Sequence, residues 1–222
     1  NEFEIIASNI NDTITLVPNA VILEEVIIHN REKISKFVDF PRKNSSYGSF
    51  PVSSRSEIIS LIKPNNENEN AIISKLVFKF EKRKKNDNAI NIKTALRINI
   101  YNVINKNIDD NVYSSNVFII DATKKDKIEI DLSDNYIEFD EKGLFIGIEV
   151  IGDIDIKGNI INDKSLIRPI LTDNIIEDYT SQTFLKYTFD KKLILKPINN
   201  ILEKSSGDKI NRNLSFGITL IK

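Results

Sequence analysis

The sequence predicts an all-β protein: an antiparallel, jelly-roll-like β-sandwich preceded by an N-terminal remnant of strands. Three observations lead to this fold class. Apolar and polar residues alternate in short runs, polar connectors separate the runs, and stripes with the period of a helix are missing. The composition agrees, because the 222 residues include 41 isoleucines and 27 asparagines. Isoleucine favours strands, and asparagine favours turns.

Residues 1–30 contain two or three predicted strands within the run DTITLVPNAVILEEVII (12–28). A piece this small cannot hold a core by itself. We therefore expect it to pack on the main domain or to belong to a domain that lies upstream. Residues 31–44 are polar and irregular, which predicts a linker. The run 24–37 could also form a short helix.

Residues 45–222 are expected to form the sandwich, because three clear alternating runs lie in this part of the chain. The residues expected to face the core are Leu76, Phe78 and Phe80; Leu96, Ile98 and Ile100; and Ile128, Ile130 and Leu132. The connectors expected between strands are residues 64–70, 82–88, 105–111, 122–127 and 133–135. Short strands joined by such connectors are typical of sandwiches and barrels.

The stretch GLFIGIEVIGDIDI (143–156) raises the question of an active site, because it carries three carboxylates. Leu144 to Ile151 is instead typical of a strand covered on both faces, with Gly147 leaving room for a close neighbour or for a bulge. After Gly152 the alternation predicts that Asp153 and Asp155 lie in water. The residues expected to face the core there are Ile154 and Ile156.

Composition excludes several classes of function. The net charge is −1, from 31 basic and 32 acidic residues, so no overall field favours nucleic acid or an anionic membrane. The chain has no cysteine, which removes disulfides, thiol nucleophiles and thiolate metal sites. No apolar run approaches the ~18 residues of a membrane-spanning helix.

No complete catalytic or metal-binding pattern is present. His29 and Glu32 fit the first half of a carboxypeptidase zinc site, but His29 is the only histidine, and such a site needs a third ligand. A Ser-His-Asp relay would need the same histidine. We therefore predict a protein that is not an enzyme and that has no cofactor and no metal.

Oxygen-rich segments are weak candidates for cations. Asp153 to Gly158 imitates the opening of a calcium loop, but Lys157 stands where an oxygen ligand is needed. Asp109, Asp110 and Asn111 in a connector form a better oxygen cluster, although a polar turn is the simpler explanation and is preferred. The basic run Lys82–Lys85 is expected at a solvated hairpin tip.

Exposed aromatic rings are the remaining candidates for recognition, because such rings stack on sugars and on partner proteins. The possible ligand or partner contacts are four tyrosines: Tyr101, Tyr113, Tyr179 and Tyr187. Tyrosine is also common in the cores and edges of sandwiches, so both interpretations stay open.

Two parts of the sequence resemble known proteins. Within residues 12–28 the spacing of a strand, a Leu-x-Pro turn and Leu-x-Glu-Val resembles the closing strands of the carboxypeptidase regulatory-like domain. The residues that carry this resemblance are Leu16, Pro18, Leu23, Glu25 and Val26. The regulatory-like domain is a small prealbumin-type β-sandwich, frequent in cell-envelope proteins of Bacteroidota.

Most of the remaining chain is similar to the β-sandwich region that follows this domain in a group of Bacteroidota envelope proteins. The matching segments, in order, are YGSF (47–50), SEIISLI (56–62), AIISKLVFKF (71–80), LRINIYNV (96–103), KIEIDLSDNYIEF (127–139), GLFIGIEVI (143–151), TFLKYTF (183–189) and NLSFGITL (213–220). The resemblance implies export to the periplasm or association with the outer membrane. It does not imply peptidase activity, because the regulatory-like domain of peptidases is non-catalytic.

The sequence thus predicts a non-catalytic envelope module that docks to an outer-membrane protein assembly. Its expected partners are envelope or outer-membrane proteins and possibly a glycan. The alternative is a carbohydrate-binding module, which would present aligned aromatic rings on one exposed face. An enzyme would instead need a pocket with converging carboxylates.

Overall fold

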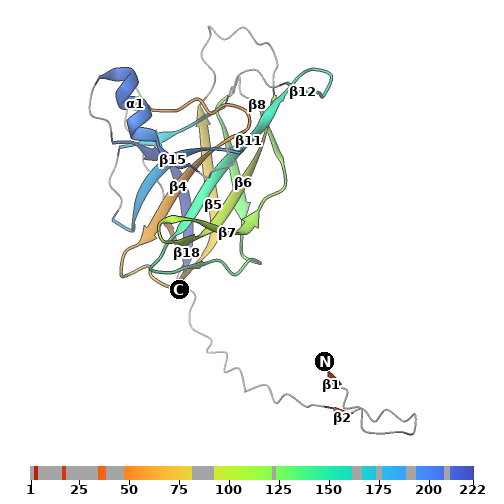
Figure 1. Ribbon diagram of the computed structural model, residues 1–222, viewed down its shortest axis with the longest axis vertical. Coiled ribbons are helices and arrows are strands. Elements are labelled where there is room, and N and C mark those ends of the chain that lie inside the picture. The colour runs from red at the N-terminus through yellow and green to blue at the C-terminus, as the bar shows by residue number, and fades with distance from the viewer. Residues whose placement is uncertain are drawn as a thin grey trace, which may run out of the picture. The chain divides into compact units, whose positions relative to one another are not determined.

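The computed structural model describes residues 3–4, 17–18, 35–38, 48–81, 93–121, 124–161, 167–173, 177–188, 194–207 and 211–222. The chain divides into two compact units, residues 1–32 and residues 33–222. In the first unit, β1 (Phe3–Glu4) pairs with β2 (Val17–Pro18) in antiparallel orientation. The second unit holds the remaining strands and a short helix (Figure 1).

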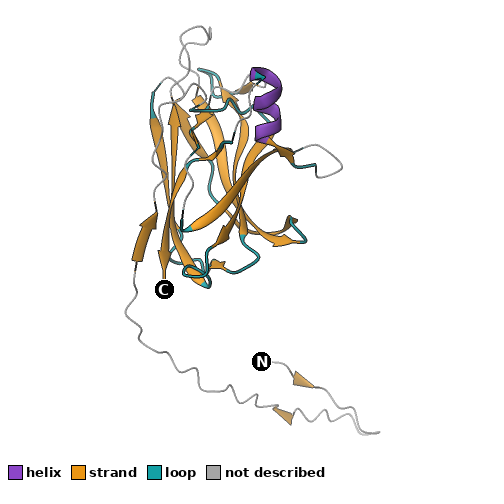
Figure 2. Cartoon of the chain, turned by 90° about the vertical axis from the view of Figure 1, so that its left-hand side faces the viewer, coloured by secondary structure: helices purple, strands orange, loops and turns teal. Residues whose placement is uncertain are grey.

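The second unit is a sandwich of two antiparallel sheets packed face to face (Figure 2). The smaller sheet contains β3 (Ser35–Val38), β5 (Ala71–Glu81), β9 (Asp126–Asp131), β10 (Glu138–Phe139), β13 (Arg168–Pro169) and β18 (Phe216–Ile221). The larger sheet contains β4 (Ser56–Pro64), β6 (Lys93–Ile104), β7 (Asn107–Ser114), β8 (Phe118–Asp121), β11 (Leu144–Ile154), β12 (Ile160–Ile161), β15 (Tyr179–Tyr187) and β16 (Lys196–Pro197). A separate pair joins β14 (Leu171–Thr172) to β17 (Asn213–Leu214).

The core lies between the two sheets and is built from their inward-facing residues. Ile58, Ile98 and Ile148 of the larger sheet are fully buried, and so are the facing residues of the smaller sheet. The rings of Phe78 and Phe216 lie 5.5 Å apart, on paired strands of that smaller sheet. The chain passes repeatedly from one sheet to the other, as in jelly rolls. The all-β sandwich that the sequence predicts is therefore confirmed.

The three alternating runs form β5, β6 and β9, and their expected core residues are buried. The opposite face of β6 is not open to water, however, because Asn99 and Tyr101 are also buried. That side of the larger sheet, its outer face, carries a second apolar cluster that includes Ile59, Tyr101 and Phe145. The central strands of the larger sheet are thus covered on both sides.

The stretch Leu144–Ile151 forms most of β11 and lies between β4 and β6 in the middle of the larger sheet. The prediction of a strand buried on both faces is correct for this part. Beyond it the expected orientation is wrong: Asp153 is 2% exposed, whereas Ile156 is 84% exposed. The register with β6 shifts between Val150 and Gly152. Such a bulge inserts one residue, which turns the following side chains to the other face.

Residues 105–111 were expected to be a connector, but most of them belong to β7. Only Asn105 and Lys106 form the turn, and both have positive φ angles, of 49° and 64°. A two-residue turn of this kind matches the twist of a hairpin. Asp109, Asp110 and Asn111 are therefore exposed residues of a strand rather than a cluster in a polar turn.

The predicted linker 31–44 also contains structure, because Ser35–Val38 form β3. This strand pairs with β18, and Ser35 lies opposite Ile221. Lys36 forms an ion pair with Asp178. The sandwich therefore begins before residue 45, where the sequence placed its start.

One helix, α1 (Ile198–Ser206), was not anticipated. It buries Ile198 and Leu202, which are one turn apart, and it ends at Gly207, whose N–H donates to the Glu203 carbonyl. Its apolar residues Ile198, Ile201 and Leu202 have helical spacing, but they span little more than one turn, which is too short to reveal a helical period in a sequence. With nine residues α1 is too short to cross a membrane, and it is the longest helix in the described part of the chain.

Two isoleucines of the same stretch provide a test of this fold. Ile148→Ala should lower the free energy of unfolding by about 2–5 kcal/mol, since it leaves a cavity at a fully buried position. Ile156→Ala should change it by less than about 0.5 kcal/mol, since that side chain lies in water. Urea unfolding followed by circular dichroism measures both values. Equal effects would contradict the burial of Ile148 in the core and the exposure of Ile156 in the turn that follows β11.

Candidate functional site

Polar side chains gather at two places in the sandwich. The first is a buried network on the outer face of the larger sheet, centred on Glu57 of β4. The second is an open cleft near the β6–β7 turn. Their burial and their hydrogen bonds decide which of them is available to a ligand.

Glu57 is fully buried, and its carboxylate accepts hydrogen bonds from three side chains. Tyr101 Oη donates to its two oxygens at 3.1 Å, and Lys186 Nζ donates at 2.7 Å. Asn99 Nδ2 donates at 3.2 Å and also reaches Glu149 Oε2 at 3.1 Å. A buried carboxylate is tolerated when it is paired and hydrogen-bonded in this way.

Gly147 of β11 makes this arrangement possible. A Cβ atom placed on Gly147 would lie 2.3 Å from Glu57 Oε1, so the glutamate side chain occupies the space that any other residue would fill. The sequence predicts that Gly147 admits a close neighbour, and Glu57 is that neighbour.

The network holds Tyr101 in its neutral form. Burial raises the pKa of the Tyr101 hydroxyl well above its ordinary value, and the charge of Glu57 and its hydrogen bond raise it further. The Lys186 ammonium lies 4.6 Å from the centre of the Tyr101 ring, at the distance of a cation–π contact. The buried Glu57 carboxylate is thus held by Tyr101, Asn99 and Lys186, and the network stabilises the sheet.

The three acids of the stretch 143–156 do not converge. Glu149 belongs to the buried network. Asp153 accepts a hydrogen bond from the Thr94 hydroxyl at 2.6 Å. Asp155 instead accepts backbone N–H groups of its own turn, which lower the pKa of its carboxyl. Each acid therefore stabilises a different part of the structure.

The four candidate tyrosines are not brought together on one face. Tyr179 is 2% exposed and stacks on Phe216 in the core, with ring centres 6.3 Å apart. Tyr101 lies in the Glu57 network, on the opposite side of the larger sheet. Tyr113 is half-buried against the core. Tyr187 is 38% exposed, and Lys196 lies 4.7 Å from its ring centre.

Two further candidates, His29 and the basic run Lys82–Lys85, lie outside the described residues. Among the residues that are described, no group of three or more acidic or histidine side chains is arranged to hold a metal ion.

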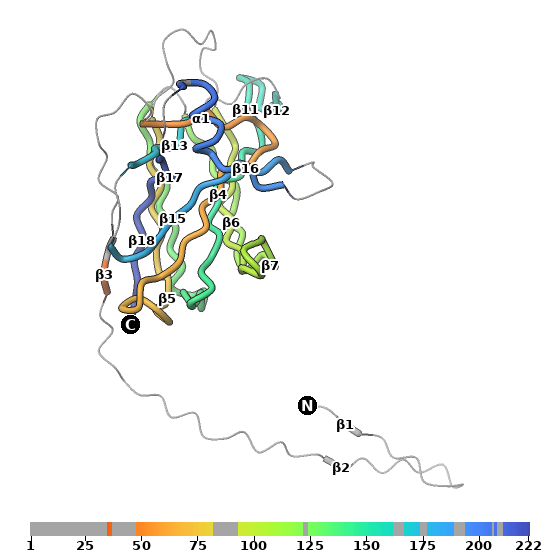
Figure 3. The backbone as a smooth tube through the Cα atoms, turned by 60° about the vertical axis from the view of Figure 1, so that its left-hand side comes forward, coloured from red at the N-terminus to blue at the C-terminus, as the bar shows by residue number. Residues whose placement is uncertain are grey.

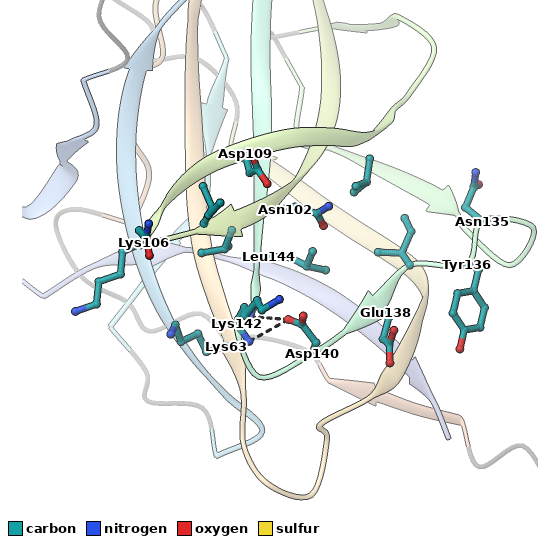
Figure 4. A pocket seen from close by; sticks show the side chains of 16 residues that line it. Lys63, Asn102, Lys106, Asp109, Asn135, Tyr136, Glu138, Asp140, Lys142 and Leu144 are labelled. Atoms are coloured by element: carbon teal, nitrogen blue, oxygen red, sulfur yellow. Dashed lines mark hydrogen bonds between the residues drawn. The ribbon is translucent and has the colours of Figure 1, made fainter.

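The cleft has a volume of about 780 Å³ and opens between two walls (Figure 4). One wall is the hairpin arm, residues 102–112, which comprises the end of β6, the turn and the first part of β7. The other wall is formed by residues 135–144, which include β10 and the start of β11. Lys63, at the end of β4, completes the lining.

The side chains of the cleft carry charge of both signs. The lysines are Lys63, Lys106 and Lys142, and the acids are Asp109, Glu138 and Asp140. Asp109 projects from the arm, while Glu138 and Asp140 lie on the facing wall (Figure 4). Asp140 also accepts the backbone N–H groups of Lys142 and Gly143, which fixes the turn that leads into β11.

Exposed apolar side chains accompany these charges. Ile104 is 53% exposed, Val112 42% and Tyr136 81%, and all three line the cleft. Large apolar groups left in water around a recess are typical of contact sites. The cleft is therefore a candidate surface for holding a ligand or a partner.

Sequence reasoning missed Tyr136 and the arm. Tyr136 follows directly after the polar turn 133–135, a position that predicts exposure of its ring. The exposure of Tyr136 could therefore have been predicted from the sequence. The arm could not, because its apolar residues, such as Ile104, Ile108 and Val112, do not alternate with polar ones.

No protein-family model matches the sequence, and no curated protein is significantly similar to it. Among solved structures, the chain is similar to a clostridial cysteine protease, Cwp84, in the form that follows propeptide cleavage. The TM-score is 0.42 and the sequence identity is 12%. The similarity covers 84% of this chain and 40% of the protease chain, so this chain spans less than half of the length of the protease.

The Glu57 network can be tested through two glycines of β11. Gly147→Ala should lower the free energy of unfolding by about 2 kcal/mol or more, because Glu57 must leave its buried partners. Gly152→Ala is the matched control. Its added methyl comes closer than an ordinary contact to one atom, Cγ2 of Ile160, at 2.5 Å. The Ile160 side chain is 56% exposed and can turn toward solvent, so a change below about 1 kcal/mol is expected. Thermal or urea unfolding distinguishes the two variants, and equal losses would refute the special role of Gly147.

Proposed function

We propose that the chain is a non-catalytic binding module of the cell envelope that docks to another envelope protein through the hairpin arm and its cleft. The observation that supports this function best is the arm itself. It is a hairpin that projects from the sandwich (Figure 3), its two strands pair with two shifts of register, and most of its side chains are exposed.

The arm contributes little to the core of the sandwich. Along β7, Ile108 and Tyr113 are half-buried, and the other side chains are exposed. Ile108 and Val103 pack on the outer apolar cluster, which holds the base of the arm in place. The rest of the arm offers ordered backbone and exposed side chains to a partner, without any loss of core packing on binding.

The cellular part of the proposal rests on sequence resemblance. The order of segments from YGSF (47–50) to NLSFGITL (213–220) is similar to envelope proteins of Bacteroidota, which favours a periplasmic or outer-membrane-associated location. We infer an accessory role in an outer-membrane protein assembly.

A second candidate function is carbohydrate binding at the same cleft. Tyr136 presents an 81% exposed ring, and Asn102 and Asn135 line the same cleft. A cleft that holds both an exposed ring and amide groups suits a sugar, which stacks on the ring and hydrogen-bonds through its hydroxyls. In this proposal a single tyrosine serves as the stacking surface, in place of the row of tyrosines expected from the sequence.

Site-specific cross-linking tests the docking function. The chain has no cysteine, so Val112→Cys provides a unique thiol in the cleft for a photoreactive benzophenone label. In native envelope membranes this label should cross-link one envelope protein, identified by mass spectrometry.

Ile156→Cys is the control, since Ile156 is 84% exposed and follows the end of β11 opposite to the cleft. That end lies roughly 33 Å along the strand from Leu144. Cross-links of equal yield and identity from both positions, or none from position 112, would argue against docking through the cleft.

The carbohydrate alternative has its own test. If the cleft binds sugars, the chain should bind a defined set of glycans on an array, and Tyr136→Ala should weaken that binding at least ~10-fold through the lost stacking. Tyr187→Ala, which removes an exposed tyrosine that does not line the cleft, should leave the binding unchanged. An array with no bound glycan would remove this candidate.

A further inference from the structure

We propose that the buried network of the larger sheet forms an isopeptide bond between the side chains of Lys186 and Asn99, with Glu57 moving the protons. This inference concerns the chain's own covalent structure and goes beyond the proposed docking function. The reaction takes place once in each molecule and needs no external substrate. Three features of the network carry it: a shared carboxylate, a donor on the amide oxygen and the exclusion of water.

The first feature is the shared carboxylate. Lys186 Nζ donates to Glu57 Oε2 at 2.7 Å, and Asn99 Nδ2 donates to Glu57 Oε1 at 3.2 Å. The amine and the amide are thus held on the two oxygens of one acid. A carboxyl group in this position can take a proton from the amine and give one to the amide nitrogen. Because both groups are held in place, their reaction is intramolecular, which raises its rate strongly.

The second feature is the donor on the amide oxygen. Ser114 Oγ donates to Asn99 Oδ1 at 2.7 Å. When an amine adds to an amide carbon, negative charge develops on this oxygen, and a donor that is already in place stabilises it. Asn99 Nδ2 also donates to Glu149 Oε2 at 3.1 Å, so both ends of the amide group are fixed.

The third feature is the exclusion of water. Glu57 is fully buried, Asn99 is 3% exposed, and the side chain of Lys186 is 12% exposed. A buried ion pair loses its hydration, and transfer of the proton from the amine to the acid removes both charges. The neutral amine is then a nucleophile. The same burial keeps water from competing with the amine.

The reaction balances without an oxidant or a co-reactant. One ammonium proton of Lys186 passes to Glu57, and the free Nζ attacks Cγ of Asn99. In the adduct, Glu57 gives its proton to Nδ2 and accepts one from Nζ. The bond between Cγ and Nδ2 then breaks, ammonia leaves, and an amide bond joins Nζ to Cγ. Glu57 is left as a neutral acid.

The bond would tie β15 to β6. The strand order β15-β4-β11-β6 places two strands between them, so one covalent bridge would span the four central strands of the larger sheet. A bridge that closes a long stretch of chain opposes unfolding, because it limits the freedom of the unfolded chain.

Intact mass spectrometry of the folded 222-residue chain tests the inference. The expected mass is lower than that of the sequence by one molecule of ammonia. Trypsin does not cleave after an acylated lysine, so the digest should contain a branched peptide in which Nζ of Lys186 is joined to Asn99. Tandem mass spectrometry of that peptide locates both ends of the bond.

Two variants remove the reaction by different routes. Glu57→Gln keeps the size of the side chain but cannot move the protons, and Lys186→Arg keeps a positive charge but lacks the amine. Each should have the full mass of its own sequence. Lys75→Arg is the matched control, because Lys75 contacts the Glu129 carboxylate at 2.6 Å in an exposed ion pair. It should still lose one ammonia. Circular dichroism establishes that each variant is folded.

Three results would overturn the inference: a wild-type chain of full mass, a loss of ammonia without the branched peptide, or the branched peptide in Glu57→Gln. A loss of ammonia without a branch would indicate a succinimide at an asparagine. If Glu57→Gln does not fold, the wild-type mass and Lys186→Arg still decide. The photoreactive label at position 112 tests the docking function separately, so either idea can fail while the other stands.

Discussion

The structure depends on β11, a strand that is packed on both of its faces. Its inner side chains, such as Ile148, join the core between the sheets, while its outer face lies beneath the Glu57 network. Such a strand has no room for a side chain at the position where the Glu57 side chain of β4 lies over its backbone. Gly147 satisfies that constraint and allows β4, β6 and β15 to meet through Glu57, Asn99 and Lys186. The outer face of the larger sheet is thereby covered by the Glu57 network together with the apolar cluster of Ile59, Tyr101 and Phe145.

The burial of Glu57 also separates structural from functional acids. Its oxygens are bound by Tyr101, Asn99 and Lys186, so a ligand could reach them only by displacing these groups. In the cleft the carboxylates of Asp109 and Glu138 face open space instead. The sequence contains 32 acidic residues, and only the packing of the folded chain shows which of their carboxylates a ligand can reach. The cleft is for this reason the stronger basis for recognition.

The fold could be predicted from the sequence because a strand with one buried face alternates apolar residues, here mostly isoleucine, with polar ones. The runs around Phe78, Ile98 and Ile130 are all buried as expected. The bulge after Val150 could not be predicted from the sequence. Apolar and polar residues still alternate after it, but the inserted residue exchanges the face that points to the core and the face that points away. The strand β7 was missed for a different reason: exposed on both faces, it needs no alternation.

The candidate site was even less accessible to sequence reasoning. Its walls come from residue 63, residues 102–112 and residues 135–144, and only the pairing of strands brings these segments together. The Glu57 network likewise joins residues 42 and 129 positions apart. Tyrosine alone was a poor guide, because Tyr179 fills the core while Tyr136, which follows a turn, lies in water.

The pairing of β3 with β18 has a mechanical consequence. Ser35 lies opposite Ile221, so the first residue of one strand and the last residue of the other are neighbours at the same end of the sheet. Tension applied between these two points would act across the ladder and open its hydrogen bonds one after another, since those bonds run perpendicular to antiparallel strands. The strand β3 would then peel away at low force while the rest of the sandwich stayed closed.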